Sequence, residues 1–451
     1  MAARTKMEKV KLSFGVEMEL YLAWRAETFT GTVPAPPGVK LSPGAPLVIK
    51  GGRLTKGAKI KALALIIEEA FPSSAGTVVS LDDRKLDKRN KEWYHLEAYR
   101  RWDVIPDGSL AIPPDELADL NSTDYGWIGA EVVSPALWAT NEGFDEVRRM
   151  CEFLQKHFWI YNARKAGFHV HVGNGNEWLP LNSLRQIAAF LYAADPVLAQ
   201  SHPRHRTNNI YCASPRLYSN VSMGRRNPVN PTQPDLPTES VEVERPSIYT
   251  RAENAVRNFF KSRASPTKPA EDNKVRKRDQ FPPRPTVGAY DIDREPIGRG
   301  LYNPIPVGPV PMITAVTEIL RSADRAAISR LMSIGPIRGA YSFVQLEQEA
   351  KRTIEFRQAA SMVDPVQTVA YARIAVGLCQ FAASASRDDL TKIILDCEMA
   401  EQTPSWFDVY DLFMEVGLYP EAKIVQAVLS GTLTDDKRRE YWLSRKHALR
   451  L

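Results

Sequence analysis

Apolar and polar residues alternate along the first part of the chain, which is the pattern of a half-buried β-strand. The apolar positions fall two apart, at Val10, Leu12, Phe14, Val16, Met18, Leu20 and Leu22. Side chains two apart share one face of a strand, so this face should pack against a core. Residues 10–22 are therefore predicted to form a strand.

The same periodicity predicts further elements along the chain. Strands are predicted at residues 92–105, 126–133, 167–172 and 352–357. Helices are predicted over residues 58–70, 143–158, 181–200, 313–334 and 365–383, with packed helices from 406 to 451. Strands in separate blocks with helices between them indicate an α+β fold rather than a regular parallel α/β array.

A proline-rich stretch interrupts this pattern at residues 228–311, which hold 15 of the 33 prolines of the chain. Few periodic apolar positions remain there, apart from a short predicted helix around residues 252–260. Because such a stretch can bury little apolar surface, it is predicted to be a long, partly disordered insertion. Its basic run at residues 274–278 leaves two interpretations open. It is a solvated insert, which we favour, or a surface that contacts nucleic acid or acidic partners.

Composition bounds the class of protein. With 451 residues, 44% hydrophobic and 25% charged, the chain has enough apolar residues for a sizeable core in one elaborated domain or two domains. A net charge of +6 is mild for this length, so binding to nucleic acid is not expected. The sequence leaves the oligomeric state open.

The four cysteines are far apart in the sequence and form no Cys-x-x-Cys pair, so they are expected to be reduced and mostly buried: Cys151, Cys212, Cys379 and Cys397. The first residues contain no apolar signal-peptide core, and no apolar run reaches the ~20 residues that a membrane span needs. A cytoplasmic protein without a membrane partner is expected.

Two carboxylates share one face of the first predicted strand. Glu17 and Glu19 project together, while Val16, Met18 and Leu20 project the other way. Like charges this close repel, and burying them is costly unless a cation neutralises them. For this pair alone, a strand with one solvated acidic face is the alternative.

Two histidines share one face of the strand predicted at residues 167–172. His169 and His171 alternate with Phe168, Val170 and Val172. A pair of histidines on one face suits contact with a metal or a phosphate about as well as a structural role. Zinc is the metal ion most often bound by such a pair, but no nearby cysteine or third histidine supports a closed zinc site.

Glu355 and Arg357 share a face of the last predicted strand, which places a carboxylate beside a guanidinium. Such a pair is often a simple ion pair. Its alternative use is to set one metal ligand next to one phosphate-binding group.

Two further acidic residues complete the candidate set. Asp107 lies in a turn after a strand, and Glu131 lies within a strand-like apolar run. Either residue alone is more often solvated than a ligand. Together with the other candidates they form a set rich in carboxylates and poor in sulfur, which suits Mg²⁺ or Mn²⁺. The phosphate-binding patterns G-x-x-x-x-G-K-[ST] and G-x-G-x-x-G do not occur, which disfavours a P-loop or dinucleotide fold.

In order along the chain, these motifs resemble the amidoligase family, within the group that holds glutamine synthetase and glutamate–cysteine ligase. The motifs are F-G-V-E-M-E from Phe14, D-G-S-L from Asp107, G-A-E-V-V-S-P from Gly129, G-F-H-V-H-V-G from Gly167 and I-E-F-R from Ile354. The resemblance covers roughly residues 10–215 and 312–425 and leaves the proline-rich insertion outside.

The resemblance implies a curved, mainly antiparallel sheet, a glutamine-synthetase-like half-barrel flanked by helices. It implies one catalytic domain over residues 1–451, with the insertion at 228–311 and a C-terminal helical part at 385–451. It also implies that Glu17, His169 and Glu355 hold one metal ion and that Glu19 and Glu131 hold another.

The resemblance assigns roles to the remaining candidates as well. His171 and Arg357 would contact phosphate, and Arg357 would stabilise the charge of phosphoryl transfer. Asp107 would contact a metal or the substrate amine. Arg206 and Asn209, in a loop similar to one near the family's site, would contact substrate or nucleotide.

The implied reaction is ATP-dependent joining of a small-molecule or peptide carboxylate to an amine through an acyl phosphate, with Mg²⁺ or Mn²⁺. Two alternatives remain open: a phosphotransferase that uses the same fold, and a catalytically silent scaffold that recruits a partner or nucleic acid through the basic insertion. The chain departs from the family at residues 340–344, where Ala-Tyr-Ser-Phe-Val replaces the usual polar residues. This departure puts the identity of the substrate in question more than the use of ATP.

Overall fold

One large sheet organises the part of the chain that the computed structural model describes, which is residues 10–29, 31, 34–36, 39, 41–50, 55–72, 99–110, 120, 124–207, 209–224, 277–287, 310–335, 338–348 and 351–447. Within these residues the sheet has nine strands, and its main path runs β3-β4-β1-β7-β9-β8. The sheet does not close on itself, and its main path is antiparallel. The predicted α+β class is confirmed.

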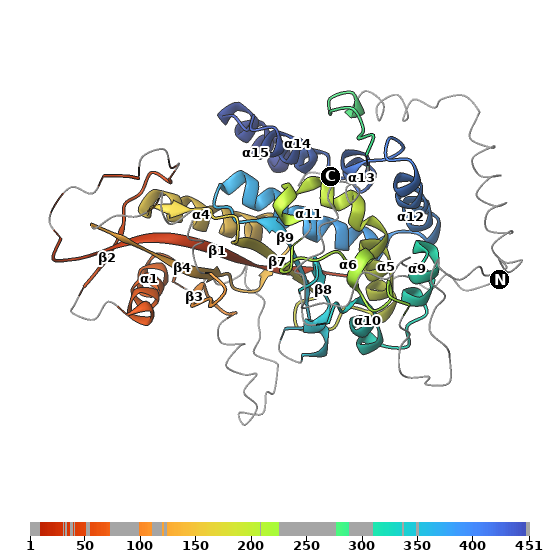
Figure 1. The fold of residues 1–451 in the computed structure, drawn as a ribbon, viewed down its shortest axis with the longest axis horizontal. Coiled ribbons are helices and arrows are strands. Elements are labelled where there is room, and N and C mark those ends of the chain that lie inside the picture. The colour runs from red at the N-terminus through yellow and green to blue at the C-terminus, as the bar shows by residue number, and fades with distance from the viewer. Residues whose placement is uncertain are drawn as a thin grey trace, which may run out of the picture.

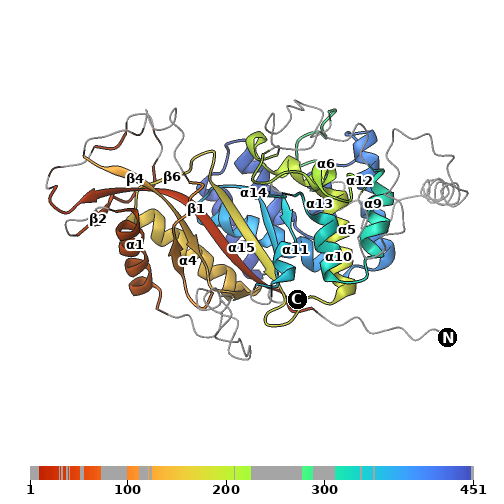
Figure 2. The ribbon, with the colours of Figure 1, turned by 60° about the horizontal axis from the view of Figure 1, so that its bottom comes forward.

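The strands come from distant parts of the sequence. Their bounds are β1 Ser13–Ala26, β2 Leu47–Ile49, β3 Asp103–Ile105, β4 Gly126–Val133, β5 Leu137–Trp138, β6 Ile160–Tyr161, β7 Gly167–Gly173, β8 Tyr341–Ser342 and β9 Ile354–Ala360. The long strand β1 lies at the centre, where it pairs with β4 on one side and β7 on the other, while β2, β5 and β6 also pair with it. Figure 2 shows β1 in red beside the yellow strand β7, with the blue strand β9 next to it.

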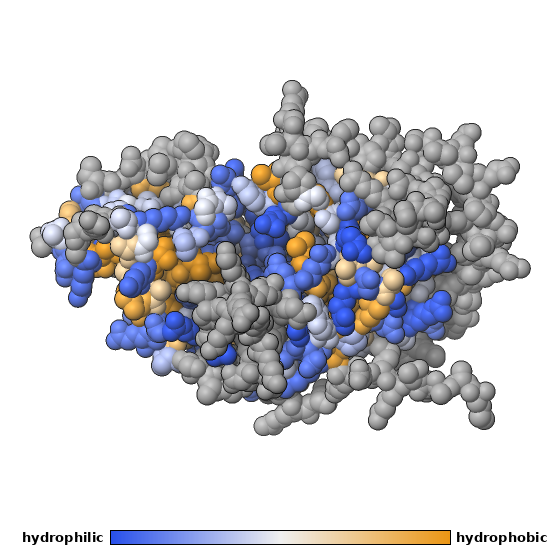
Figure 3. All heavy atoms as spheres, turned by 90° about the horizontal axis from the view of Figure 1, so that it is seen from below, coloured by the Kyte–Doolittle hydropathy of each residue, from blue (hydrophilic) through white to orange (hydrophobic). Residues whose placement is uncertain are grey.

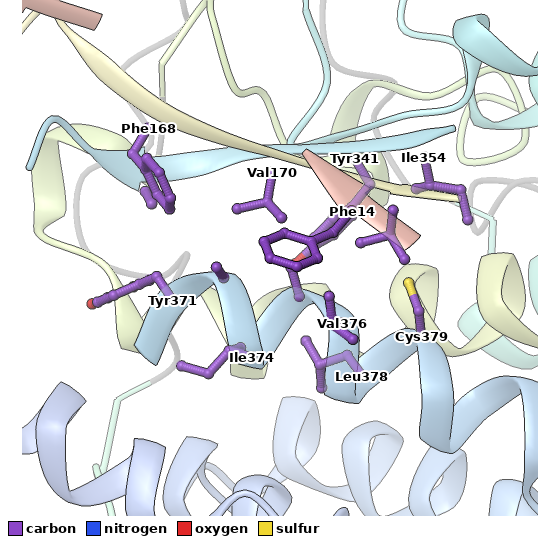
Figure 4. Packing of buried hydrophobic residues seen from close by; sticks show 14 of the residues in the cluster. Phe14, Phe168, Val170, Tyr341, Ile354, Tyr371, Ile374, Val376, Leu378 and Cys379 are labelled. Carbon is purple, nitrogen blue, oxygen red and sulfur yellow. The ribbon is translucent and has the colours of Figure 1, made fainter. Parts of the chain in front are cut away.

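The predicted apolar face of β1 is buried, from Val10 to Leu22. Helices α4 (Asn141–His157), α5 (Leu181–Leu198) and α11 (Pro365–Ser384) lie on the same side of the sheet as this face (Figure 1). In Figure 4, Phe168, Val170 and Ile354 of the sheet face Tyr371, Ile374 and Leu378 of α11. The opposite face of the sheet is therefore left for polar side chains.

Local chemistry fixes where the two long helices beside β1 begin. The Thr140 side chain accepts a hydrogen bond from the Gly143 amide at the start of α4. Asp364 accepts from the Val366 and Gln367 amides at the start of α11, where Pro365 occupies the first turn. These caps satisfy amides that have no partner inside the helix.

The remaining helices surround these two layers. They are α1 Lys56–Ala70, α6 Pro215–Tyr218, α9 Met312–Leu320, α10 Arg325–Met332, α12 Arg387–Gln402, α13 Val409–Glu415, α14 Tyr419–Leu429 and α15 Asp435–His447, with short 3₁₀ turns at Ala199–Ser201, Arg204–Arg206 and Val344–Glu347. The region predicted as helical over residues 313–334 is two helices, because Asp324 caps a new helix at Arg325. The predictions of helices near residues 58–70, 143–158 and 365–383 are confirmed.

Two predicted elements differ from the structure. The strand predicted at 92–105 is a strand only at Asp103–Ile105, residues 99–101 are a turn and a bend, and residues 92–98 lie outside the described part. The helix predicted over 181–200 ends at Leu198, with Pro196 inside its last turn, and continues as the 3₁₀ turn Ala199–Ser201. The short helix predicted around 252–260 also lies outside the described residues.

The four cysteines are buried and free, as predicted. Within the described part, no helix combines the length and the apolar character needed to cross a membrane. Of the proline-rich insertion predicted at 228–311, the structure describes residues 277–287 and 310–311. The prediction of its partial disorder falls on the other residues, outside the described part.

Candidate functional site

Four strands bring the candidate side chains together on the face of the sheet opposite α11. Strand pairing sets Glu19 of β1 directly across from Glu131 of β4, and Glu17 of β1 across from His169 of β7. On the next pair of strands, His171 of β7 lies across from Glu355 of β9. In Figure 3, which looks onto this side of the molecule, hydrophilic side chains gather near the middle. Residues from across the sequence thus become neighbours.

Glu17, His169 and Glu355 form a first, buried group. The Nδ1 atom of His169 lies 3.3 Å from Oε2 of Glu17 and 3.8 Å from Oε1 of Glu355. One ligand-type atom from each of the three residues lies within 4.8 Å of the other two. This spacing matches a set of side chains that can hold one metal ion.

Glu19, Asp107 and Glu131 form a second group, in which one carboxylate oxygen from each residue lies within 4.8 Å of the other two. Asp107 follows β3 in a turn, where its carboxylate accepts hydrogen bonds from the amide and hydroxyl of Ser109, at 2.7 and 2.8 Å. Glu19 also accepts a hydrogen bond from the Gly167 amide at 2.5 Å. The second group therefore consists of carboxylates alone, and hydrogen bonds from Ser109 and Gly167 hold two of the three.

The carboxylates of the two groups differ in the direction of their pKa shifts. Burial by itself would raise the pKa of Glu17, but His171, His169 and Lys351 together hold this pKa well below its ordinary value. Burial likewise opposes the lowering of the Glu355 pKa that His171 and Arg357 produce. In the second group, burial and the neighbouring carboxylates Glu17, Glu19 and Asp107 raise the pKa of Glu131 to about 9. The pKa values of Glu17 and Glu355 in the first group are thus lowered, whereas the pKa of Glu131 in the second group is raised.

The raised pKa of Glu131 bears on whether these residues suit divalent cations. Packed carboxylates repel, and in the protein alone a proton on Glu131 relieves that repulsion. A divalent cation would relieve it instead, and oxygen ligands are those that Mg²⁺ and Mn²⁺ prefer. The donor set of the second group fits such an ion, and the first group, with one imidazole and two carboxylates, fits one as well.

A polar cavity of about 430 Å³ opens over both groups. Its acidic wall carries Glu17, Glu19, Asp107 and Glu131, and basic side chains line it too: Lys165, Arg206, Arg338 and Arg357. Cations and anions thus surround one space, which suits a ligand that carries negative charge and is bridged to the acidic wall by metal ions.

Two of these basic residues are fixed by hydrogen bonds. Arg357 donates from Nε to the Tyr211 carbonyl at 3.1 Å and forms an ion pair with Glu355. Arg206 is 1% exposed and donates to the carbonyls of Arg357, at 2.6 Å, and Gln358, at 3.3 Å. Both guanidinium groups are therefore held at the edge of the cavity rather than being free in solvent.

Asn209, the other candidate in the loop of Arg206, has a different role in the structure. Its side chain donates to the His205 carbonyl at 3.2 Å and accepts from the Tyr211 amide at 2.8 Å. It is not among the residues that line the cavity. The structure gives Asn209 a contact that shapes the loop, and its contact with substrate or nucleotide stays a prediction.

A smaller, mostly apolar pocket adjoins the first group and shares Glu17 with the polar cavity. His171 lines it, with Nδ1 3.0 Å from the Thr353 hydroxyl and Nε2 3.0 Å from Oε1 of Glu17 in a direction that makes no hydrogen bond. Lys351 and Tyr99 line the same pocket, and Nζ of Lys351 lies 3.6 Å from Oε1 of Glu17.

Sequence reasoning did not single out Lys351, Tyr99, Lys165, Arg338 or Tyr211. Lys351 stands in the turn before β9, outside the alternating pattern, and Arg352 beside it has a left-handed φ of 54°. Periodicity gives no direction for a side chain in such a turn. The only available signal was a basic residue close to the I-E-F-R motif.

Comparison with known families places the chain beside a family of enzymes. The family model described as "Putative amidoligase enzyme" matches residues 10–236, which is just over half of the 451-residue chain. The matched range contains both histidines and every predicted acidic ligand except Glu355, which lies beyond it together with Arg357. Searches of curated proteins and of solved structures found no match.

Proposed function

The chain belongs to the amidoligase family, and from that premise we propose that it is an ATP-dependent carboxylate–amine ligase. The proposal takes ATP, a carboxylic acid and an amine as substrates and an amide or isopeptide as product. It also equates the open antiparallel sheet with the curved half-barrel of the glutamine synthetase group.

One observation carries the proposal. Two groups of metal-ligand side chains lie on one face of the sheet, and they share a cavity with buried or partly buried guanidinium groups. Phosphoryl transfer needs little covalent help from a protein. It needs positioning and neutralisation of the phosphate charge, and this arrangement offers both.

We propose that Glu17, His169 and Glu355 hold one Mg²⁺ or Mn²⁺ ion and that Glu19, Glu131 and Asp107 hold another. Bound there, these ions would lower the negative charge of the ATP phosphates. Asp107 keeps the alternative role of a contact to the substrate amine, because its carboxylate is less buried than that of Glu19.

The chain's own cations complete the arrangement. Arg357 would contact the transferred phosphoryl group, since Glu355 and the Tyr211 carbonyl fix its guanidinium at the cavity. His171 would contact phosphate from the side of the smaller pocket. Arg206 would bind an anionic group of the acid or the nucleotide, because burial and two carbonyls hold it in place.

The proposed reaction has two steps. A carboxylate oxygen of the acid attacks the γ-phosphorus of ATP, the bond to the bridging oxygen breaks, and ADP leaves with an acyl phosphate formed. The amine nitrogen then attacks the acyl carbon, loses a proton, and displaces phosphate, which keeps the oxygen that came from the acid. Apart from bound metal ions, the chemistry needs only the three substrates and the orientation that the site supplies.

That retained oxygen provides the test. The purified chain is incubated with ATP, MgCl₂, a panel of ¹⁸O-labelled carboxylic acids and a panel of amines, and the released phosphate is examined by ³¹P NMR. The proposal predicts one ¹⁸O atom in the phosphate and a condensation product in the mass spectrum. The Glu17→Gln/Glu19→Gln double variant should lose both signals, while Glu177→Gln, the same chemical change at an exposed position, should keep them.

Other outcomes separate the alternatives. Phosphate without ¹⁸O would mean hydrolysis of ATP by water and contradict the acyl phosphate. A stable phosphate adduct without condensation would indicate a phosphotransferase. ATP binding and turnover that are both absent with every pair would favour the silent scaffold.

A further inference from the structure

Residues 277–287, within the proline-rich stretch, lie against helices α13 and α14. In Figure 1 they are the short green segment beside α13. Phe281 is 8% exposed, its ring stacks on Tyr410 with centroids 4.6 Å apart and planes at 13°, and the Tyr419 ring meets it edge-on at 5.9 Å. An aromatic side chain of the segment is thus inserted between two aromatic side chains of the helices.

Two arginines flank this anchor and pair with two aspartates. Arg278 donates to Asp408 at 2.5 Å, and Arg284 donates to both carboxylate oxygens of Asp411, at 2.6 and 2.9 Å. The carboxylates of both ion pairs are largely buried, since the Asp408 and Asp411 side chains are 2% and 10% exposed, while the Arg284 side chain is 38% exposed. The forked Arg284–Asp411 geometry adds direction to the attraction.

The two aspartates need this cover. They form a capping box at the start of α13, in which each carboxylate accepts from the backbone amide of the other residue. Two carboxylates buried side by side repel and cost free energy unless cations balance them. Arg278 and Arg284 are the cations that the structure places there.

The segment makes its contacts through side chains. The backbone hydrogen bonds described for it are local, from Gln280 to Lys277 and from Phe281 to Arg278, and Arg278 also donates to the Pro282 carbonyl at 2.8 Å. Prolines 282, 283 and 285 restrict the chain further. The segment is short, its backbone hydrogen bonds are local, and it contacts the helices through one aromatic side chain and two arginines. These are features of a peptide ligand.

We propose that the α13–α14 surface is a peptide-binding site for the pattern Arg-x-x-Phe-x-x-Arg, occupied in this chain by residues 277–287 as a reversible intramolecular ligand. The site accepts the same pattern when it is offered on a separate molecule. This proposal is independent of the proposed ligase activity, since it uses none of the residues of the polar cavity.

The test uses the full chain as the Phe281→Ala/Arg284→Ala variant, in which residues 277–287 should no longer occupy the site. A fluorescent peptide of residues 277–287 is titrated with this variant and with the wild-type chain, and its anisotropy is followed. The variant should bind the peptide at least ~10-fold more tightly than the wild type, whose site is already filled. A peptide with Phe281→Ala, and the variant with Asp411→Asn added, should each weaken binding by a similar factor.

Two results would overturn the proposal: no binding to the Phe281→Ala/Arg284→Ala variant, or equal binding of a scrambled peptide of the same charge. A concentration-dependent dimer of the wild type that is lost in the variant would support the site, as exchange of the segment between two copies. If the variant does not fold, trypsin cleavage after Lys277 and Arg278 in the wild type replaces the titration. Cleavage there should be slow and become several-fold faster in Asp411→Asn, and equal rates would again overturn the proposal.

Discussion

Glu19 and Glu131 lie directly opposite each other on the antiparallel strands β1 and β4. Like charges in this position destabilise a sheet, and burial with neighbouring carboxylates raises the pKa of Glu131 to about 9. A sheet built for stability alone would not place two carboxylates there. The pair is therefore expected to lower the stability of the metal-free protein and to favour cation binding, and the two effects can be measured separately.

Glu131→Gln is expected to stabilise the metal-free protein and to weaken cation binding. The amide keeps the shape of the side chain and is neutral without taking up a proton, so the folded metal-free protein no longer bears the cost of protonating Glu131. The free energy of unfolding in EDTA should therefore rise by about 1 kcal/mol. It also replaces a charged carboxylate ligand by a neutral amide oxygen, so the Mn²⁺ affinity should fall at least ~10-fold. Urea unfolding in EDTA and calorimetric titration with Mn²⁺ measure the two effects.

The exposed Glu177→Gln serves as the control and should change neither quantity. A Glu131→Gln protein that is less stable in EDTA, or that binds Mn²⁺ as tightly as the wild type, would contradict the role given to this pair.

Gly167→Ala is expected to disturb the site without unfolding the protein. A Cβ atom there would lie 2.8 Å from Nη2 of Arg206 and 2.9 Å from Nε2 of His169, so both side chains would have to move. We expect Mn²⁺ affinity to fall about 10-fold, equal to roughly 1.4 kcal/mol. Gly57→Ala, whose Cβ would meet nothing within 4 Å, is the matched control. An unchanged Mn²⁺ affinity in Gly167→Ala would contradict the requirement that His169 and Arg206 keep their positions for metal binding.

Arg357→Lys should lower kcat while metal binding persists. Lysine keeps the charge but loses the forked geometry by which Arg357 contacts the Tyr211 carbonyl and Glu355. Loss of one preoriented donor to a developing charge costs about 10²–10³ in kcat. Steady-state kinetics of the ¹⁸O reaction measure this, with Arg148→Lys on α4, which does not line the cavity, as control. A change in KM alone would instead assign Arg357 to simple binding.

His202 should make the protein acid-sensitive. Its ring lies 5.5 Å from that of Tyr371, and burial, assisted by Arg206, lowers its pKa to about 3. Between pH 6.5 and 3 the unfolded chain takes up a proton that the folded chain does not, so stability falls as the pH falls. His202→Phe keeps a ring and removes this proton. Urea unfolding from pH 7 to 4 should show that the free energy of unfolding falls less steeply with falling pH in the variant than in the wild type, by up to about 1.4 kcal/mol per pH unit. Parallel curves would contradict it.

The strands that carry the site were predictable because each motif alternates polar and apolar residues over several positions. In Phe14–Leu22 the two glutamates had to share a face once the strand was assigned, and the structure confirms this, since both line the polar cavity. The same holds for His169 and His171 on β7. Local periodicity thus identified both faces of the sheet.

The register between strands was beyond sequence reasoning. Glu17 meets His169 across 152 positions of the chain, and only the assembled sheet sets that pairing. Lys351 was missed because it lies in a turn, and the docking of Phe281 on Tyr410 was missed because it joins segments that no pattern relates. Pairing at long range depends on packing, which a single sequence states only indirectly.

The most direct test of the account is the number of Mn²⁺ ions bound in the presence of a non-hydrolysable ATP analogue, measured from free Mn²⁺ by electron paramagnetic resonance. The wild type should bind two ions, one for each group of ligands. Glu17→Gln should lose the ion of the first group and Glu131→Gln that of the second, each variant keeping the other. A wild-type chain that binds no Mn²⁺ with the analogue, or variants that bind as many ions as the wild type, would contradict a metal–nucleotide site on this face of the sheet.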